Sequence, residues 1–447
     1  MKSSALRTIS IILAICAFCG LLAACNDTGT VPEQTSAATD APTQTGAQTT
    51  EAETEPVFSE VRALVSDGTG NYTVIRPTKM GSAGVNAAVE LIARLKELCG
   101  VKLSISEDFV KDPSEIDPNA CEVLFGLTNR TGESELPAKG FSIRTERNRV
   151  VILARKEAYL RYAAEYFVNT ILSDPELAEV GEGKIILKKD IDYVSEEFSY
   201  LQEVISSSAD LRADVEYLFT VPYPDDLHKN PQGGFMDREG KYYYQVFLNR
   251  DNTTNEAGNQ DIIIKYDVQT HKIVGRSGEL SLNHANDITW FPEKNALIVV
   301  HNNPNRGRIS FVDPDTLQVV DSTDIGMNIY CMDYSEKLDR FVIGVSGGQN
   351  FRFLKNDFKM TDRNLRMATS LTAGYTTQGC SADDNYIYFV LYNENVITVY
   401  DWSGNFVSLI HFDVGTIEPE NISVVNDEIY VTCNKNGAAV YRITPKP

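Results

Sequence analysis

The sequence predicts a multidomain chain in which a small α+β domain precedes an all-β domain, a five-bladed β-propeller. Three observations predict this class. Strand and helix patterns alternate over residues 58–200. Over residues 205–447 strand patterns recur in units of 42 to 54 residues, the period of four-stranded propeller blades. The length of 447 residues also exceeds what one compact core usually holds.

The chain is acidic, with 41 Lys and Arg residues against 62 Asp and Glu and a formal net charge of −21. It lacks the excess of Lys and Arg residues with which proteins bind phosphate groups, so we expect no nucleic acid as a partner. An acidic exterior would also be repelled by anionic lipid headgroups. With 43% hydrophobic residues, most of the chain can still fold.

The first 25 residues have the pattern of an export signal. Lys2 and Arg7 form a positive region, and residues 9–22 form an apolar stretch too short for a stop-transfer helix. The stretch ends in the letters LAAC at Cys25, which resembles the lipobox of bacterial lipoproteins. The resemblance implies removal of residues 1–24 and a diacylglycerol, with palmitate-type chains, on Cys25. An ordinary secretory signal with a chance cysteine is the alternative.

Residues 25–57 are expected to form a disordered tether behind this anchor. Residues 26–56 contain nine Thr, six acids, no Lys or Arg and almost no large apolar side chains. Such a segment cannot bury enough surface to offset its chain entropy. It would hold the folded part off the cell membrane, facing the extracellular side or the periplasm.

Residues 58–200 predict a small sheet with helices packed on one face. Gly100 ends the first helix, and Pro175 follows the second. The predicted elements are strands over 71–76, 101–106, 122–126 and 184–188, a hairpin of 141–145 with 149–153, and helices over 85–99 and 160–171.

This order, with the segment VLFGLTNR over residues 123–130, resembles the non-catalytic N-terminal domain of bacterial glycosidases such as α-glucuronidases and β-hexosaminidases. In those enzymes the domain braces a catalytic barrel. No (β/α)8 barrel pattern follows in this chain. The resemblance therefore implies a carbohydrate-related ancestry and no inherited glycosidase activity.

The repeated unit of the second half contains a polar start, an apolar strand, an acidic turn and further strands. Its copies begin near Gln232, Asn286, Ile329, Gln378 and Glu420, with spacings of 54, 43, 49 and 42 residues. The last copy lacks a fourth strand, and residues 215–221 have that strand's pattern. Pairing 215–221 with 437–443 would remove the unpaired edge. We therefore predict that the N-terminal strand completes the last blade.

The first strand of each propeller blade lines the central channel, so the starts of the copies converge in space. Amides, a carboxylate, imidazoles and a phenol there would suit a hydroxyl-rich ligand. Channel water and backbone groups could equally satisfy these side chains. The candidate ligand-binding residues at this mouth are Gln232, His284, Asn286, Tyr330, Gln378, Glu420 and His228.

We predict no metal and no cofactor, although a channel metal stays the least favoured alternative. Calcium or zinc would need several ligands, and Glu420 is the only aligned acid. Asp287 lies one step along its strand from Asn286, so we expect its side chain to point away from the channel.

The cysteines that would remain after export show no catalytic or metal-binding pattern. Each of them lies in an apolar run and none forms a CxxC pair, which favours buried thiols acting as small apolar side chains. No Gly-x-Ser-x-Gly elbow, His-Glu-x-x-His helix or Gly-rich phosphate loop occurs, so we assign no catalytic residue. The cysteines that would remain after export are Cys99, Cys121, Cys331, Cys380 and Cys433.

The segments HANDIT over 284–289 and TQG over 377–379 are similar to those of bacterial extracytoplasmic propellers. That group includes six-bladed lactonase-like proteins and five-bladed glutaminyl-cyclase-like or teichoic-acid-related proteins. The chain departs from the lactonase-like metal site, which takes several acids and asparagines from different blades. The resemblance therefore implies binding in place of metal-dependent hydrolysis.

These observations together predict a membrane-anchored lipoprotein whose propeller binds an extracellular ligand, with a glycan or cell-wall polymer favoured. An enzyme of lyase, hydrolase or cyclase type, acting at the channel mouth through Glu420 and His284, is one alternative. A module that docks onto other envelope proteins is another.

Overall fold

The computed structural model describes residues 61–132, 136–249 and 260–446. The predicted signal, Cys25 and the tether lie outside these residues. No helix in the described part of the chain has the length and apolar character needed to cross a membrane.

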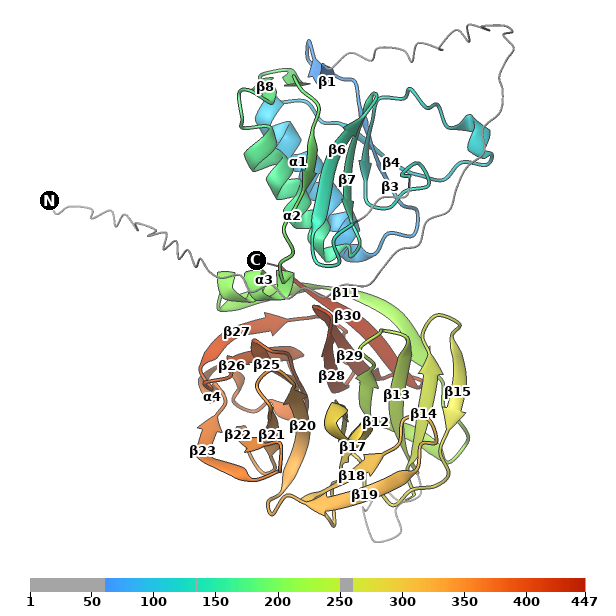
Figure 1. Ribbon diagram of the computed structural model, residues 1–447, viewed down its shortest axis with the longest axis vertical. Coiled ribbons are helices and arrows are strands. Elements are labelled where there is room, and N and C mark those ends of the chain that lie inside the picture. The colour runs from blue at the N-terminus through green and yellow to red at the C-terminus, as the bar shows by residue number, and fades with distance from the viewer. Residues whose placement is uncertain (1–60, 133–135, 250–259, 447) are drawn as a thin grey trace, which may run out of the picture. The chain divides into compact units, whose positions relative to one another are not determined.

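The first region contains a six-stranded sheet in the order β10-β6-β7-β5-β3-β4 (Figure 1). β4, β3, β5 and β7 run parallel, and β6 and β10 are antiparallel additions. The strands are β3 (Thr73–Arg76), β4 (Ser104–Glu107), β5 (Glu122–Phe125), β6 (Phe141–Glu146), β7 (Arg149–Ala154) and β10 (Asp192–Val194).

Two helices, α1 (Ser82–Cys99) and α2 (Ala158–Tyr166), pack on one face of this sheet, as predicted. Gly100 ends α1 because it adopts a left-handed conformation with φ 75° and donates its N–H to the Lys96 carbonyl. α2 continues as a π-helical turn over Phe167–Ile171. A third helix, α3 (Tyr200–Ser207), begins with the Ser199 hydroxyl capping the N–H of Gln202.

A second, four-stranded sheet has the order β2-β1-β9-β8. The strand predicted over 184–188 is β9, and it pairs with β1, so the single predicted sheet was wrong. The reason is that residues 62–66 form a strand that the sequence did not predict, which offers β9 an antiparallel partner. The strands are β1 (Arg62–Ser66), β2 (Thr69–Gly70), β8 (Ala178–Gly181) and β9 (Lys184–Leu187).

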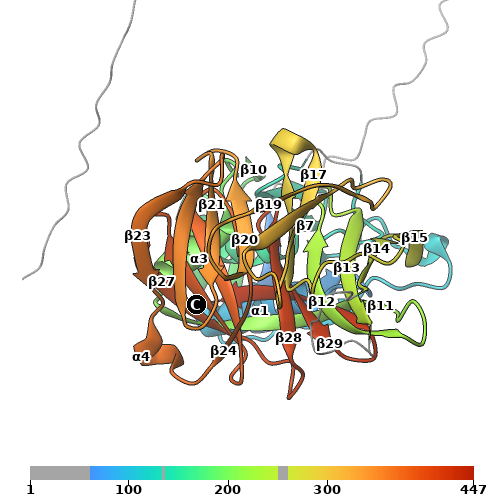
Figure 2. The ribbon, with the colours of Figure 1, turned by 90° about the horizontal axis from the view of Figure 1, so that it is seen from below.

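The second region is almost all β and propeller-like, with four-stranded antiparallel sheets around a common centre (Figure 1). Figure 2 shows the same strands from the side. Three of these sheets are β12 to β15, β16 to β19 and β20 to β23. Their strands are β12 (His228–Met236), β13 (Tyr242–Asn249), β14 (Ile262–Asp267), β15 (Lys272–Arg276), β16 (Asp287–Phe291), β17 (Ala296–Val300), β18 (Arg308–Val312), β19 (Val319–Asp324), β20 (Ile329–Ser335), β21 (Arg340–Val345), β22 (Asn350–Lys355) and β23 (Met360–Arg366).

The remaining strands form one eight-stranded sheet in the order β24-β25-β26-β27-β11-β30-β29-β28. A short parallel pairing of β27 with β11 joins its two halves. The strands are β24 (Thr376–Ala382), β25 (Tyr386–Tyr392), β26 (Val396–Asp401), β27 (Phe406–His411), β28 (Pro419–Val425), β29 (Glu428–Asn434), β30 (Ala438–Lys446) and β11 (Asp210–Val221).

The first strands of the sheets are neighbours in a closed cycle, β12 to β16 to β20 to β24 to β28 and back to β12. We call these the inner strands. The predicted closure is confirmed, because β11 pairs antiparallel with β30 from Val215 opposite Ile443 to Val221 opposite Ala438. A strand from before the first repeat therefore completes the sheet of the last one.

The described residues belong to one compact unit, and the turn between β28 and β29 contacts the α+β region. The Asp427 carboxylate accepts hydrogen bonds from the Tyr159 hydroxyl at 2.8 Å and the Ser199 hydroxyl at 3.0 Å. Lys139 forms an ion pair with it at 3.3 Å, and the Lys156 ammonium bonds the Asn426 carbonyl. Side chains of the α+β region therefore fix the position of this turn.

We predict that Val440→Pro destabilises the ring, because Val440 pairs with Phe219 on one side and Thr432 on the other. Proline has no backbone N–H, so the buried carbonyl that accepts from residue 440 would lose its partner. We expect the free energy of unfolding to fall by more than about 2 kcal/mol. Urea unfolding followed by tryptophan fluorescence measures the loss. Val320→Pro is the control, because Val320 is exposed and unpaired at a bulge in the edge strand β19. Equal effects of the two prolines would contradict the closure.

Candidate functional site

The structure brings three of the sequence-predicted residues together at the N-terminal ends of the inner strands, which we call the N-terminal mouth. The Gln232 side chain lies between the other two. Its Nε2 donates to Glu420 Oε2 at 3.3 Å, and its Oε1 lies 2.9 Å from His284 Nε2. Glu420 and His284, which lie 188 and 52 positions from Gln232 in the sequence, are thus joined to it in one hydrogen-bonded network.

The proton positions in this network follow from its geometry. Gln232 Nε2 also bonds the Pro231 carbonyl at 2.9 Å, which can only accept, so Gln232 Oε1 faces His284 as an acceptor. His284 Nε2 must then carry the hydrogen, and in the neutral ring Nδ1 keeps a lone pair. Within the described residues His284 Nδ1 is buried and has no hydrogen-bond partner. Burial lowers the pKa of His284 to about 4, so the ring is neutral at pH 7.

The backbone at His284 is unusual and is held by a buried acid. Asn283 and His284 both adopt positive φ, at 55° and 59°. The His284 N–H donates to Asp261 Oδ2 at 3.2 Å, and Asp261 is fully buried. Burial raises the pKa of Asp261 to about 7. A left-handed histidine held in this way orients the imidazole toward Gln232.

Glu420 is 7% exposed, and its carboxyl group is kept neutral. Burial, and after it the neighbouring Glu418 carboxylate, raise the pKa of Glu420 to about 8. Glu418 itself accepts a hydrogen bond from Gln378 Nε2 at 2.7 Å. Gln378, another predicted residue, therefore belongs to the same mouth through Glu418.

The remaining predicted residues are not part of this hydrogen-bonded network; they are Asn286, Tyr330 and His228. Asn286 accepts a hydrogen bond from Asn302 Nδ2 at 3.1 Å. Tyr330 is buried beneath the mouth, and its hydroxyl has no hydrogen-bond partner in the described part of the chain. His228 is 1% exposed, with Nδ1 2.9 Å from Asp225 and Nε2 3.2 Å from the Gln260 carbonyl.

Asp287 does not point away from the ring, so that prediction was wrong. Its Oδ2 accepts the Met332 N–H of β20 at 2.9 Å, and its Oδ1 accepts Asn421 Nδ2 of β28 at 2.7 Å. The reason is that both faces of an inner strand meet neighbouring inner strands near the centre. The alternation of side chains along the strand therefore does not carry Asp287 out of the core.

Other buried polar side chains make the same kind of link from one inner strand to the next. Asp333 of β20 accepts the Ala382 N–H of β24 at 2.6 Å, and Ser381 accepts the Val424 N–H of β28 at 2.9 Å. Ser423 of β28 accepts the Met236 N–H of β12 at 3.3 Å. These bonds set the spacing of the inner strands and hence of both mouths.

The C-terminal ends of the same five strands surround a cavity of about 280 Å³, which we call the C-terminal mouth. Trp290 and Phe235 supply partly buried aromatic surface, and Asp333 and Asp384 supply carboxyl groups. The Ser335 hydroxyl donates to Asp384 at 3.1 Å, and Arg238 forms an ion pair with Glu336 across the opening. Burial raises the pKa of Asp333.

Sequence reasoning missed the C-terminal mouth because it followed only the starts of the repeats. The available signal was the polar residues near the ends of two first strands, Asp333 of β20 and Ser381 of β24, which line this cavity. None of the seven predicted residues contributes to the lining of this cavity.

No protein-family model matches the chain, and no curated protein sequence matches it. Solved structures resemble about half of it. A glutaminyl cyclase from Myxococcus xanthus has 12% identity and a TM-score of 0.41, covering 53% of this chain and 98% of its own. The Cps50 (Swd1) β-propeller domain of Myceliophteria thermophila has 9% identity and a TM-score of 0.31, with coverages of 51% and 99%. A luciferin-regenerating enzyme has 12% identity and a TM-score of 0.36, with coverages of 52% and 95%. At such low identity these similarities say nothing about activity.

We predict that Glu420→Gln stabilises the protein increasingly as pH rises. The folded pKa of about 8 lies above the ordinary value of 4.5, so the unfolded chain loses its proton first and wild-type stability falls between those pH values. Glutamine cannot ionise, and the advantage of the variant should grow to about 4 kcal/mol.

Urea unfolding of both proteins across this pH range measures the difference. Glu239→Gln, on an exposed turn, is the control and should unfold in parallel with wild type at every pH. A difference between Glu420→Gln and wild type that does not change with pH would contradict the buried neutral carboxyl group.

Proposed function

We propose that the second region is a five-bladed propeller in which β11 is the outer strand of the last blade. The sheet orders, the cycle of inner strands and the β11 to β30 pairing support this count. We also infer that the first region descends from the N-terminal domain of glycosidases, on the strength of its strand order and the segment over 123–130.

We further propose that the protein is an extracytoplasmic lipoprotein anchored through Cys25. The support is the n-region, the short apolar stretch and the LAAC sequence at the start of the chain. The acidic, lysine-free and arginine-free segment over 26–56 would serve as the tether. In this setting the ligands within reach of the folded part are polymers of the cell envelope or its surroundings.

The ligand that we propose is a hydroxyl-rich polymer, a glycan or cell-wall polymer, bound at the C-terminal mouth. The observation that carries this proposal is the cavity of about 280 Å³ to which all five inner strands contribute. That volume is near the lower end of the range for small-ligand sites, about 300 to 1,000 Å³. One sugar unit of a chain would fill it.

The lining chemistry also favours such a ligand. The aromatic face of Trp290 offers an apolar platform for the C–H face of a sugar ring. Asp384, Ser335 and Glu336 offer donors and acceptors for hydroxyl groups. At the N-terminal mouth Gln232 bonds Glu420 and His284 directly.

We predict that Trp290→Ala weakens binding to the polymer. Loss of the aromatic platform should cost about 1.5–3 kcal/mol, equivalent to at least about tenfold in affinity. The probes are purified peptidoglycan sacculi and insoluble cellulose, xylan and starch. Co-sedimentation of the full chain with each probe measures the fraction bound.

Phe109→Ala is the matched control, because Phe109 is 69% exposed on the α+β region, away from the cavity lining. It should bind as wild type does. Equal binding by Trp290→Ala and wild type, or no sedimentation of wild type with any probe, would contradict the proposal. Recovery of envelope proteins in place of polymers would favour the docking alternative.

A second candidate function is acid–base catalysis at the N-terminal mouth. It is favoured by two titratable groups whose pKa values are shifted in opposite directions, with Glu420 at about 8 and His284 at about 4. The protonated carboxyl would act as a general acid and the neutral imidazole as a base. We expect Glu420→Gln to abolish release of soluble fragments from the same probes while leaving co-sedimentation intact, if this function holds.

A further inference from the structure

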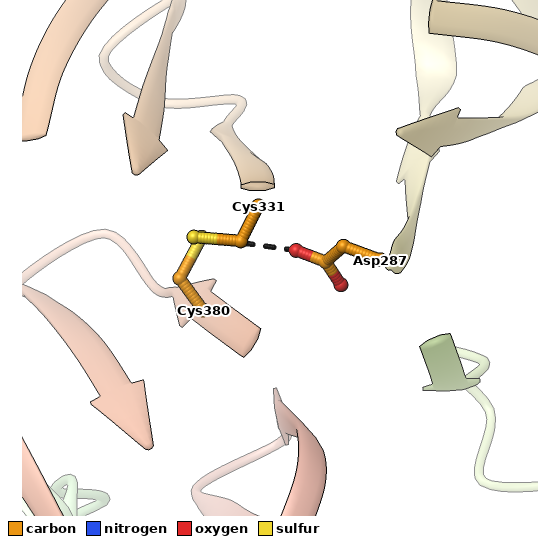
Figure 3. A group of neighbouring side chains, drawn as sticks. All are labelled: Asp287, Cys331 and Cys380. Carbon is orange, nitrogen blue, oxygen red and sulfur yellow. Dashed lines mark hydrogen bonds between the residues drawn. The ribbon is translucent and has the colours of Figure 1, made fainter. Parts of the chain in front are cut away.

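A group of soft and hard metal-ligand atoms lies at the centre of the ring, outside both mouths. Asp287 begins β16, Cys331 lies in β20 and Cys380 lies in β24, three consecutive inner strands. One carboxylate oxygen and the two Sγ atoms all lie within 4.8 Å of one another. Figure 3 shows the two sulfur atoms together and one oxygen of Asp287 facing them, with a hydrogen bond from the Cys380 thiol to that oxygen.

The three side chains are almost completely enclosed. Asp287 is 1% exposed, Cys331 0% and Cys380 2%. An isolated buried carboxylate is costly unless it is paired or bound to a metal. Within residues 61–132, 136–249 and 260–446, no lysine or arginine forms a salt bridge with Asp287; its partners are neutral groups. A cation is therefore the missing complement of this site.

The second ligand shell is already in place. Met332 N–H at 2.9 Å and Asn421 Nδ2 at 2.7 Å hold the two oxygens of Asp287, and the Ile288 N–H bonds Oδ1 at 2.8 Å. Such bonds orient a ligating carboxylate, and Oδ2, which accepts one backbone N–H, keeps a lone pair that faces the Cys380 thiol 3.9 Å away. The carboxyl group is thus fixed in the direction of the thiols and not free to rotate away.

A further unpartnered oxygen borders the group. Tyr330 is 7% exposed, and its hydroxyl has no hydrogen-bond partner in the described part of the chain. A Cβ placed on Gly344 would lie within 2.5 Å of both Tyr330 Cζ and Cys331 Sγ, so the phenol end of the ring lies beside that sulfur. A buried polar atom without a partner is rare, and here it supplies a fourth donor.

We propose that Asp287, Cys331 and Cys380 bind a zinc ion at the centre of the inner-strand ring, with the Tyr330 hydroxyl or a water molecule completing four ligands. Two thiolates and a carboxylate make a donor set that suits tetrahedral zinc. Zinc takes the two thiols and the carboxyl group in their ionised forms, and every proton that these three groups held passes to solvent. The three ligand charges of −1 and the zinc charge of +2 then leave −1, which the three N–H donors on Asp287 stabilise.

The zinc would tie together three inner strands that are far apart in the sequence. Its role is structural, because the ligands are closed off from both mouths and no substrate can reach them. Enclosed ligands also require that the ion enters while the ring forms. The proposal is independent of the polymer-binding function, since no ligand of the zinc lines the C-terminal mouth.

The test is elemental analysis of the full chain, produced with zinc in the medium and purified with a phosphine reductant. We expect about one zinc per chain in wild type and background zinc in Cys331→Ser and Cys380→Ser. Cys433→Ser is the matched control, because Cys433 is equally buried in β29 but lies outside the group, and it should keep its zinc. Wild type without zinc, or Cys433→Ser losing as much as the other two, would overturn the proposal.

A second measurement keeps the proposal testable if the serine variants do not fold. Wild type produced with cobalt should show the thiolate-to-cobalt charge-transfer absorption of a tetrahedral sulfur site, and its absence would overturn the proposal. A disulfide between Cys331 and Cys380 is the rival state. Mass spectrometry of the unreduced chain, purified without reductant, would reveal it as the loss of two hydrogens, and its presence in the zinc-replete protein would also overturn the proposal.

Discussion

Antiparallel pairing of β11 with β30 is the constraint on which the ring of sheets depends. It joins residues more than 200 positions apart, from Val215 opposite Ile443 to Val221 opposite Ala438. Without it β11 and β30 would each expose an unpaired edge, and the first and last sheets would have no reason to meet. Because the ring is closed, the inner strands are forced together at the centre, and their polar side chains must satisfy one another there.

The centre of the ring is accordingly polar, although it is buried. Asp287, Asp333, Ser381 and Ser423 each accept an N–H from the next inner strand. These bonds offset the cost of enclosing polar groups and give the ring a defined spacing. They also divide the channel into two openings of different chemistry. The N-terminal mouth has polar side chains that bond one another, and the C-terminal mouth has a cavity lined by aromatic and polar side chains.

Much of the architecture could be predicted because local patterns carry it. The 42- to 54-residue period predicted recurring strands over 205–447, and Gly100 predicted the end of α1. Repeat alignment predicted that Gln232, His284 and Glu420 converge, since equivalent positions of a ring must meet. His228 has no place in that set because Asp225, three residues earlier, holds its ring. The partner of β9 was missed because β1 has no distinctive pattern of its own.

The sequence by itself determined the order of the propeller-like strands and the segment that closes the ring, because the periodicity that marks them is a local property. The count of five blades and the export signal stay predictions. Only the tertiary structure decided which side chains face each other across the centre. Asp287, Cys331 and Cys380 meet there although they are 44 and 49 residues apart in succession. The physical reason is that both faces of an inner strand are enclosed by neighbouring strands. Alternation along one strand therefore cannot indicate which residues are buried, and contact at the centre is set by the packing of the whole ring.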